Sequence, residues 1–235
     1  MNILCTICAR GGSKGVTNKA LRKINGKHLI GITIKQALLS KLFDEVVVST
    51  DSKKIQNIAI KNGAKSWFLR SKSLSNDYSP KIPAIRDALL KSEAKFKKKF
   101  DVCVDLDITS PLRNIQDIKN SLKLFLKKKN TENLFSVCNA RRNPYFNMVE
   151  IKNNKVSLIK KFHKIRYFSR RQSSPKVFDL NGSIYIWKRS RLLKSDSLFS
   201  KNTNVYIMPQ SKSIDIDSYF DLNLIKYLLK KNINE

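Results

Sequence analysis

Hydrophobic and polar residues follow two different periods along this chain. Short apolar runs, typical of buried strands, are separated by longer stretches with apolar residues at three- and four-residue spacing, which is typical of amphipathic helices. The predicted strands are Ile3–Cys8, Glu45–Ser49, Val102–Leu106, Leu134–Val137, Ser183–Trp187 and Val205–Met208. The predicted helices are His28–Lys41, Lys53–Asn62, Lys81–Lys95, Ile115–Lys127 and Tyr219–Lys230.

The order of these elements predicts an α/β fold. Strands and helices alternate through about residue 140, and such a β-α-β-α order implies right-handed crossovers and a mostly parallel sheet. Ligands of such sheets bind beyond the carboxyl ends of the strands. The loops that follow strands are therefore the first places to look for a site.

The segment at about 141–177 breaks this rhythm. Two short alternating runs, Asn147–Ile151 and Lys155–Ile159, flank the polar turn Lys152–Asn154 and predict a hairpin. A basic, serine-containing passage, Arg170–Pro175, follows. We interpret the segment as an excursion from one domain spanning residues 1–235, suited to a subunit contact or a lid.

Length and composition limit the class of protein. A chain of 235 residues suits one α/β domain. It contains no uncharged apolar run long enough to span a bilayer, and no basic residues precede its short N-terminal apolar stretch, so neither a membrane span nor a signal peptide is predicted. The four cysteines lie in apolar runs without zinc-site spacing, so we expect reduced core thiols in the cytoplasm.

The formal net charge is +29, from 47 Lys plus Arg against 18 Asp plus Glu. Such an excess is typical of nucleic-acid-binding proteins. However, most of the basic residues are lysine, whereas sites that read phosphates and bases favour arginine. A solvated basic surface is the favoured interpretation. Attraction of phosphorylated substrates, nucleic acid or acidic lipid is the alternative.

A glycine-rich loop, Ala9–Gly15, follows the first predicted strand. It holds three of the chain's seven glycines, and glycine permits positive φ and close backbone approach, so successive N–H groups can surround an anion. Arg10, Lys14 and Lys19 add positive charge. The spacing fits neither a P-loop nor G-x-G-x-x-G. The loop predicts a phosphate-binding site; the alternative is an ordinary strand-to-helix turn.

Two pairs of carboxylates occupy similar positions. Asp105 and Asp107 share one face at the end of a predicted strand, where they could hold a metal or bind a polyol, or simply end the strand. Asp215 and Asp217 share a face before the last helix, where they could hold Mg²⁺ together with phosphate oxygens. The alternative for Asp217 is a helix N-cap.

Several segments occur together in one order: ARGGSKG (9–15) with Lys19, VVVSTDS (46–52), LDITSPLR (106–113), NGSIYI (181–186) and SIDIDSYFDL (213–222). With these segments the chain resembles the acylneuraminate cytidylyltransferases, the CMP–sialic acid synthetases, over nearly its whole length. The variants LDITSPLR and RRNPYFN (141–147) most resemble the branch that activates legionaminic acid.

The resemblance implies a Rossmann-like nucleotidyltransferase core and a homodimer in which a small dimerisation arm crosses into the partner's site. The implied reaction joins CTP and a nine-carbon 2-keto sugar acid to give the CMP-sugar and pyrophosphate, by in-line attack of the anomeric hydroxyl on the α-phosphate. Mg²⁺ is the implied cofactor, and neither a membrane nor nucleic acid is an expected partner.

The resemblance also implies roles for individual residues. The implied nucleotide-binding residues are Ala9, Arg10, Gly11, Gly12, Ser13, Lys19, Arg70, Asp77 and Ser79. The implied sugar-binding residues are Asp107, Thr109, Ser110, Arg171, Gln172, Asn181 and Tyr185. Arg10, Lys19, Asp215 and Asp217 would be catalytic, the two aspartates as metal ligands.

Two departures from the family pattern leave the sugar open. Many relatives carry asparagine where this chain has Ala20, which removes one contact to the nucleotide, and many carry glutamine where it has Asp107. We expect legionaminic or N-acetylneuraminic acid as the substrate. Pseudaminic acid or Kdo is the alternative within the same chemistry. A basic nucleic-acid-binding protein and, more weakly, a non-enzymatic interaction protein are alternatives of another class.

Overall fold

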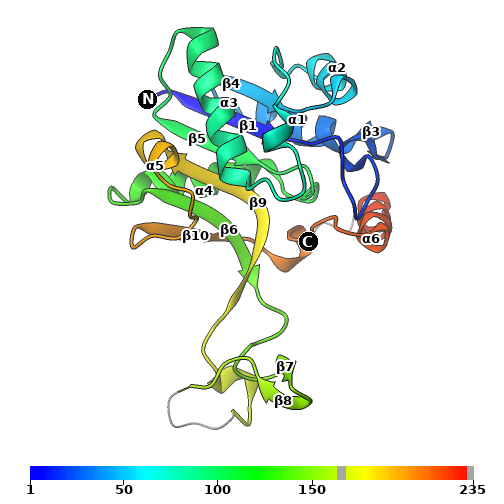
Figure 1. Cartoon of the computed structure of the whole chain (residues 1–235), viewed down its shortest axis with the longest axis vertical. Coiled ribbons are helices and arrows are strands. Elements are labelled where there is room, and N and C mark those ends of the chain that lie inside the picture. The colour runs from blue at the N-terminus through cyan, green and yellow to red at the C-terminus, as the bar shows by residue number, and fades with distance from the viewer. Residues whose placement is uncertain (163–167, 232–235) are drawn as a thin grey trace.

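The computed structural model describes residues 1–162 and 168–231, and its centre is a six-stranded sheet (Figure 1). The strands, in the order in which they neighbour one another, are β10 (Thr203–Ile207), β6 (Asn133–Asn139), β9 (Phe178–Lys188), β5 (Val102–Leu106), β1 (Ile3–Cys8) and β4 (Glu45–Ser49). The pairs β1–β4, β1–β5 and β10–β6 are parallel, and only β9 runs antiparallel to its neighbours. The predicted mostly parallel α/β fold is confirmed.

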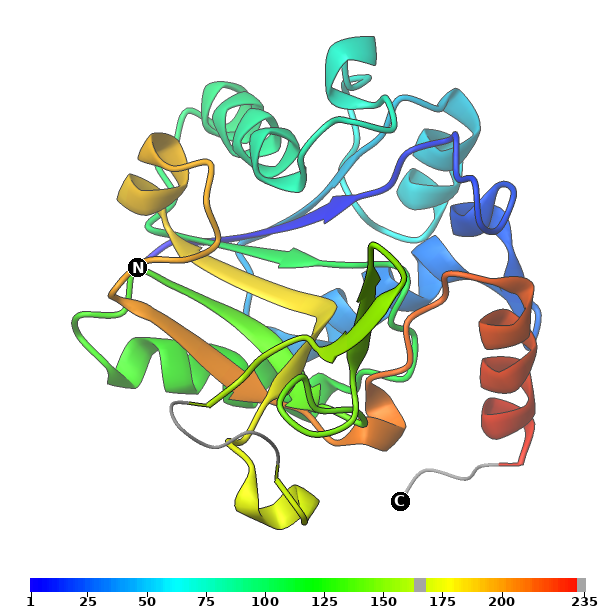
Figure 2. The ribbon, with the colours of Figure 1, turned by 60° about the horizontal axis from the view of Figure 1, so that its bottom comes forward.

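The two-residue period of the strands explains why helices cover both faces. In β1, the odd-numbered apolar residues pack with α1 (Leu29–Ser40), α2 (Lys53–Lys61) and α4 (Ile115–Lys127). Leu4 instead packs with α3 (Lys81–Phe96) and α5 (Arg189–Lys194). Figure 2 shows α3 and α5 on one side of the sheet and α4 on the other.

A third apolar cluster joins the last helix, α6 (Tyr219–Lys230), to the start of the chain. Its members are Val16, Ile24, Leu29, Leu112, Ile216, Leu222 and Ile225. Ser218 caps α6 through a reciprocal capping box with Asp221. The cluster and the cap hold residues 213–217, here called the SIDID segment, against the loop that follows β1. Figure 2 shows α6 beside this loop and beside the short strands β2 (Lys23–Ile24) and β3 (Lys27–His28).

The strands β6 and β9 extend beyond the sheet and lead into an arm, seen at the bottom of Figure 1. The predicted hairpin is present there as β7 (Val149–Lys152) and β8 (Lys155–Leu158). Its two turn residues, Asn153 and Asn154, have φ of 50° and 59°, the left-handed conformation that two-residue hairpin turns require. Within the excursion at 141–177, residues 163–167 lie outside the described residues.

The long predicted helices agree with the structure within one or two residues at each end. The prediction missed short elements: the six-residue α5 and four 3₁₀ turns, η1 (Lys19–Leu21), η2 (Lys72–Leu74), η3 (Arg171–Ser173) and η4 (Gln210–Lys212). Elements this short contain less than two helical turns, so no periodicity marks them. Among the described helices, none has the length and apolar character that crossing a membrane requires.

Candidate active site

A cleft of about 390 Å³ opens at the carboxyl ends of β1 and β5. Its walls come from the loop after β1, the segment between β4 and the first turn of α3, the loop after β5, and the residue Asp217. The predicted site residues that line it are Ala9, Arg10, Ser13, Lys19, Arg70, Asp77, Ser79, Asp107, Thr109 and Asp217. Residues far apart in sequence are thus gathered at the place where α/β sheets bind ligands.

The glycines of the loop after β1 provide close approach rather than an unusual backbone conformation. None of the three has a positive φ. A Cβ atom on Gly15 would lie 2.0 Å from the backbone oxygen of Asp217, so only glycine lets the loop touch the SIDID segment. The Gly11 N–H donates to Asp51 Oδ1 at 2.7 Å. A Cβ on Gly12 would meet open space.

Two cations of the loop are held by one carboxylate. Asp77 lies 2.9 Å from Arg10 Nη1 and 2.7 Å from Lys14 Nζ, and Arg10 also donates to the carbonyl of Asn76 at 2.9 Å. The hydrogen bond from Lys14 is the main cause that keeps the pKa of Asp77 below its usual range. In this state Asp77 neutralises the cations that a polyphosphate would need.

Lys19 connects the loop to the segment before α6. Its Nζ donates to the carbonyl of Ile216 and lies 3.3 Å from Asp217 Oδ1. The Lys19 side chain is only 12% exposed, whereas that of Asp217 is 80% exposed. The ammonium is therefore fixed at the cleft wall, and the carboxylate beside it is open to solvent.

Arg70 and Ser79 line the cleft between β4 and α3. The Arg70 backbone N–H donates to the Thr50 carbonyl at 2.8 Å, just after β4, and its Nε donates to Ser75 Oγ at 3.1 Å. Ser79 Oγ donates to the Ser73 carbonyl at 2.6 Å. These bonds give the segment a defined shape although it contains no long helix or strand.

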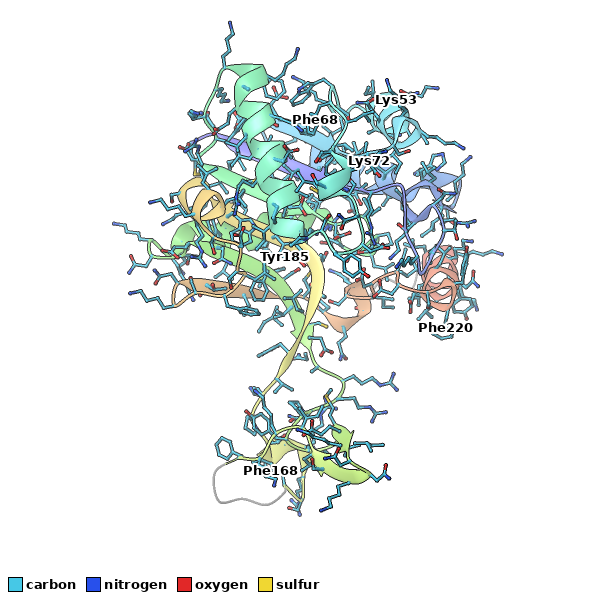
Figure 3. The ribbon with its side chains drawn as sticks, viewed as in Figure 1. Lys53, Phe68, Lys72, Phe168, Tyr185 and Phe220 are labelled. Carbon is cyan, nitrogen blue, oxygen red and sulfur yellow. The ribbon has the colours of Figure 1, made fainter. Side chains whose placement is uncertain are left out.

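Asp105 and Asp107 point to the same face, as the strand period predicts, and share one cation. Lys81 Nζ lies 3.0 Å from Asp105 Oδ2 and 2.5 Å from Asp107 Oδ2, and 4.3 Å from the centroid of the Tyr185 ring. Figure 3 shows Tyr185 on β9 beside the first turn of α3. Burial by itself raises the pKa of Asp107, but the charge and hydrogen bond of Lys81 and the hydrogen bonds from Thr109 lower it overall.

Asp215 is a partly buried carboxylate close to Asp107 and Asp217. Its Oδ1 is buried and has no hydrogen-bond partner among the described residues. Burial raises its pKa to about 6, and the charges of Asp107 and Asp217 add to this effect. Gly182 lies beside it with a φ of 63°, the left-handed conformation that favours glycine. A buried anionic oxygen without a partner is one that a bound cation would stabilise.

The comparison with known proteins decides the family. The sequence model of the family described as cytidylyltransferase matches residues 4–231. The chain belongs to the cytidylyltransferase family. The predicted resemblance is thereby confirmed, and with it an enzyme that is a transferase.

Individual relatives of this cytidylyltransferase are similar over most of its length. It is 50% identical over 194 residues to the CMP-N,N′-diacetyllegionaminic acid synthase of Campylobacter jejuni, covering 83% of this chain and 80% of that one. It is 34% identical over 200 residues to a pseudaminic acid cytidylyltransferase of the same species, covering 83% and 82%. A solved CMP:2-keto-3-deoxy-manno-octonic acid synthetase complexed with CTP shares the fold, with a TM-score of 0.72, 17% identity, and 99% and 100% of the two chains covered.

Three predicted sugar contacts, Ser110, Asn181 and Tyr185, are not on the surface of this cleft; Tyr185 is 7% exposed and lines a neighbouring cavity. Ser110 is fully buried, and Asn181 is 5% exposed. Asn181 accepts from Ser136 Oγ at 2.6 Å and donates to Ser213 Oγ at 2.9 Å, which connects two sheet strands to the SIDID segment. The structure does not place the side chain of Ser110 or Asn181 for direct contact with a ligand. Asn181 instead cross-links the elements beneath the site, whereas the buried Ser110 hydroxyl has no hydrogen-bond partner among the described residues.

Arg171 and Gln172 lie away from the cleft of their own chain. They line a separate cavity of about 650 Å³ where the arm leaves the sheet. Arg171 Nη2 donates to the carbonyl of Ala140 there. Their assignment to the sugar pocket of a partner therefore stays a prediction.

The sequence analysis missed Lys81 and gave Arg113 no role. Arg113 is 1% exposed, and its Nη1 donates to the Ser183 carbonyl at 2.7 Å. Burial lowers its pKa to about 10. Both cations lie next to Asp107. The sequence could have indicated such cations, because two neighbouring carboxylates at the end of a buried strand require positively charged partners.

Proposed function

We propose that this cytidylyltransferase transfers CMP from CTP to the anomeric hydroxyl of a nine-carbon 2-keto sugar acid of the legionaminic type. The observation that carries the proposal is the cleft itself, in which a glycine-rich cationic loop faces the carboxylates of two other loops. The 50% identity to a relative named as a CMP-N,N′-diacetyllegionaminic acid synthase supports this sugar over the pseudaminic acid alternative, for which the identity is 34%.

The nucleotide half of the cleft offers donors suited to a triphosphate. Arg10 and Lys14 would exchange Asp77 for phosphate oxygens, and Ser13 and Lys19 lie on the same wall. Phosphoryl transfer needs mainly positioning and neutralisation of developing charge, which these groups supply.

The base would lie between Arg70 and Ser79, which line the remainder of the cleft on this side. Both residues are held by hydrogen bonds to the segment between β4 and α3. This rigidity favours one orientation of the nucleotide over many.

Mg²⁺ is the proposed cofactor, with Asp215 and Asp217 as its protein ligands. Carboxylate oxygens are the ligands that Mg²⁺ prefers, and the buried Oδ1 of Asp215 has no hydrogen-bond partner among the described residues. Among these residues no group of three or more His, Cys, Asp or Glu side chains forms a metal cluster. A bound Mg²⁺ would take its other ligands from phosphates and water. When bound, it would neutralise phosphate charge.

The sugar acid would occupy the other end of the cleft, beside Asp107 and Thr109, with Tyr185 behind Lys81 in the neighbouring cavity. In the proposed reaction the anomeric oxygen bonds to the α-phosphorus, the bond from that phosphorus to the bridging oxygen breaks, and pyrophosphate leaves. The hydroxyl proton is released. Arg10 and Lys19 would stabilise the negative charge that develops on the phosphates.

The arm supports a homodimer as part of the proposal. Val149, Ile151 and Val156 of its hairpin are 57%, 74% and 66% exposed. Exposed apolar side chains gathered on one small element are typical of a protein interface. A partner's arm would bring its Arg171 and Gln172 to the sugar end of this cleft, where the arginine would attract the substrate carboxylate.

We also propose the cytoplasm as the location. All four cysteines are unpaired, and three of them are buried. Free thiols persist in a reducing compartment.

The experiment that tests the function is pyrophosphate release by the purified protein with CTP and Mg²⁺. The panel of acids contains diacetyllegionaminic, N-acetylneuraminic and pseudaminic acids and Kdo, with ATP, GTP and UTP as nucleotide controls. Release with CTP and a nine-carbon acid is the expected result. Silence of the folded protein across the panel, together with tight, strongly salt-dependent binding to generic DNA or RNA, would replace the proposal with the nucleic-acid alternative.

A further inference from the structure

Lys81 occupies a position that helix electrostatics disfavours. It is the first residue of α3, follows the N-cap Pro80, and no acidic residue accompanies it in the first turn. The N-terminus of a helix carries partial positive charge and stabilises anions, so a lysine there is unfavourable unless something else compensates it. Here the compensation comes from the sheet, in the form of Asp105 and Asp107.

The contacts of Lys81 fix its ammonium group in three directions. Asp105 Oδ2 and Asp107 Oδ2 lie on it at 3.0 Å and 2.5 Å, and the Tyr185 ring lies at 4.3 Å. The hydrogen bond of Lys81 goes to Asp107, while Asp105 adds an ion pair and the Tyr185 ring a cation–π contact. Lys81 thus lines the cleft as a cation already paired with two carboxylates.

Asp107, in contrast, retains capacity to bind a ligand. Its Oδ2 accepts from Lys81, and its Oδ1 accepts from the N–H and the hydroxyl of Thr109, both at 3.1 Å. A carboxylate has about four acceptor positions, so about one remains. The Asp107 side chain is 23% exposed and lines the cleft, so this position is within reach of a bound molecule.

We propose that Lys81 is a positioning residue of the sugar half of the site: it fixes the Asp107 carboxylate so that this carboxylate accepts a hydrogen bond from an N–H or O–H group of the sugar acid. The inference rests on the proposed function, because it names what reads the sugar at that same site. Asp105 is the anchor of the arrangement, since it is fully buried and is itself held by the Thr6 hydroxyl at 2.8 Å.

The test is a set of substitutions in the full-length protein, read as separate KM values for CTP and for the sugar acid. Lys81→Met keeps the length of the side chain and removes its charge. It should raise KM for the sugar on the order of tenfold or more, the size of a lost hydrogen bond to a charged group, with KM for CTP nearly unchanged. Lys81→Arg retains the charge and should return the sugar KM towards the wild-type value.

Lys91→Met is the matched control. Lys91 lies on the same helix, pairs with Asp87 at 2.9 Å and lies 4.6 Å from the Phe68 ring, but it does not line the cleft. This variant loses the same kinds of interaction away from the site and should keep both KM values. An equal rise of the sugar KM in Lys91→Met and Lys81→Met would overturn the inference.

Asp107→Asn provides a second test in case Lys81→Met does not fold. This variant keeps the ion pair between Lys81 and Asp105, so we expect it to fold. It should raise the sugar KM to a similar extent, and Lys81→Met on the Asp107→Asn background should add little, because one residue acts through the other. Fully additive effects, or a sugar KM that neither substitution changes, would overturn the inference.

A second sugar acid separates the two possible donors. If the N–H of an acylamino group donates to Asp107, an acid that carries hydrogen in place of its acylamino groups should show no KM difference between wild type and Lys81→Met. If a hydroxyl common to both acids donates, both should show the difference. Absence of pyrophosphate release in the wild type and in Lys91→Met would count against the proposed function itself, whereas an active wild type with an unchanged Lys81→Met would count only against this inference.

Discussion

The contact between Gly15 and Asp217 offers a sharp test of how the site is held together. A Cβ on Gly15 would lie 2.0 Å from the backbone oxygen of Asp217. Side-chain and backbone atoms in real structures keep at least about 3 Å apart, so Gly15→Ala must move the two segments apart by about 1 Å or more. The atom in the way belongs to the backbone, so a change of side-chain rotamer cannot relieve the overlap.

The displacement should affect both stability and turnover. Overpacking of a close contact destabilises proteins by about 1–3 kcal/mol, which lowers the Tm of a chain of this size by several degrees. The moved segment carries Asp217 and the Ile216 carbonyl, both partners of Lys19. A misplacement of about 1 Å in a catalytic group can reduce turnover about 10²-fold, so kcat should fall more than stability alone explains. The assays are thermal unfolding and pyrophosphate release at saturating CTP, well below the Tm of the variant.

Gly12→Ala is the control for stability, because a Cβ there would meet no atom within 4 Å and the residue has no positive φ. Its Tm should stay near that of the wild type. The reasoning is refuted if Gly15→Ala keeps wild-type Tm and kcat, which would mean that the loop and the SIDID segment do not touch in solution.

Three further predictions concern single charged groups. Lys19→Ala is expected to lower kcat about 10²-fold with little change of Tm, because Lys19 would neutralise charge on the phosphates; full turnover of the folded variant would contradict this role. Burial raises the pKa of Asp215 to about 6 from 3.8, so the folded protein binds this proton more tightly than the unfolded chain, and stability should fall as pH rises from about 4 to about 6. Asp215→Asn removes the free-energy cost of the buried charge, at most about 3 kcal/mol. Urea unfolding should therefore show that the variant is more stable than wild type at pH 7 but not at pH 4. A difference that does not depend on pH would be evidence against the raised pKa of Asp215. In wild type but not in this variant, Mg²⁺ should raise the Tm at pH 7. Asp77→Asn frees Arg10 and should lower KM for CTP, whereas a higher KM would show that Asp77 contacts the nucleotide itself.

The fold could be predicted from the sequence because its signals are local and repeated. Each long element carries its own period of two or about 3.6 residues, and the β-α order then limits the topology. The position of β9 could not be predicted in this way. This strand is followed in the chain by α5 and β10, yet it inserts between β5 and β6 in the antiparallel direction. Such long-range pairing depends on how all the strands assemble into one sheet, and no local sequence pattern indicates this.

The candidate site could be predicted where chemistry depends on residue type at a strand end. The glycine-rich loop and Asp107 line one cleft, as their positions after strands indicate, and Asp217 joins them from the segment before the last helix. The prediction failed where the direction of a side chain decides whether the residue reaches the cleft. Ser110 carries a hydroxyl in a promising motif but points into the core. Lys81 carries no motif, but the first turn of α3 brings it to the cleft.

The net charge of +29 suggests a site that attracts anions by an excess of cations, but the cleft is organised differently. Among the described residues that line it, Arg10 and Lys14 have Asp77 as a partner, Lys19 has Asp217, and Lys81 has Asp107. A polyphosphate would therefore bind to Arg10 and Lys14 by replacing Asp77 as their anionic partner, and the free energy of binding would be the difference between two similar interactions. We therefore expect substitution of Arg10 or Lys14 to raise KM for CTP and Asp77→Asn to lower it, whereas substitutions of surface lysines elsewhere should leave it unchanged.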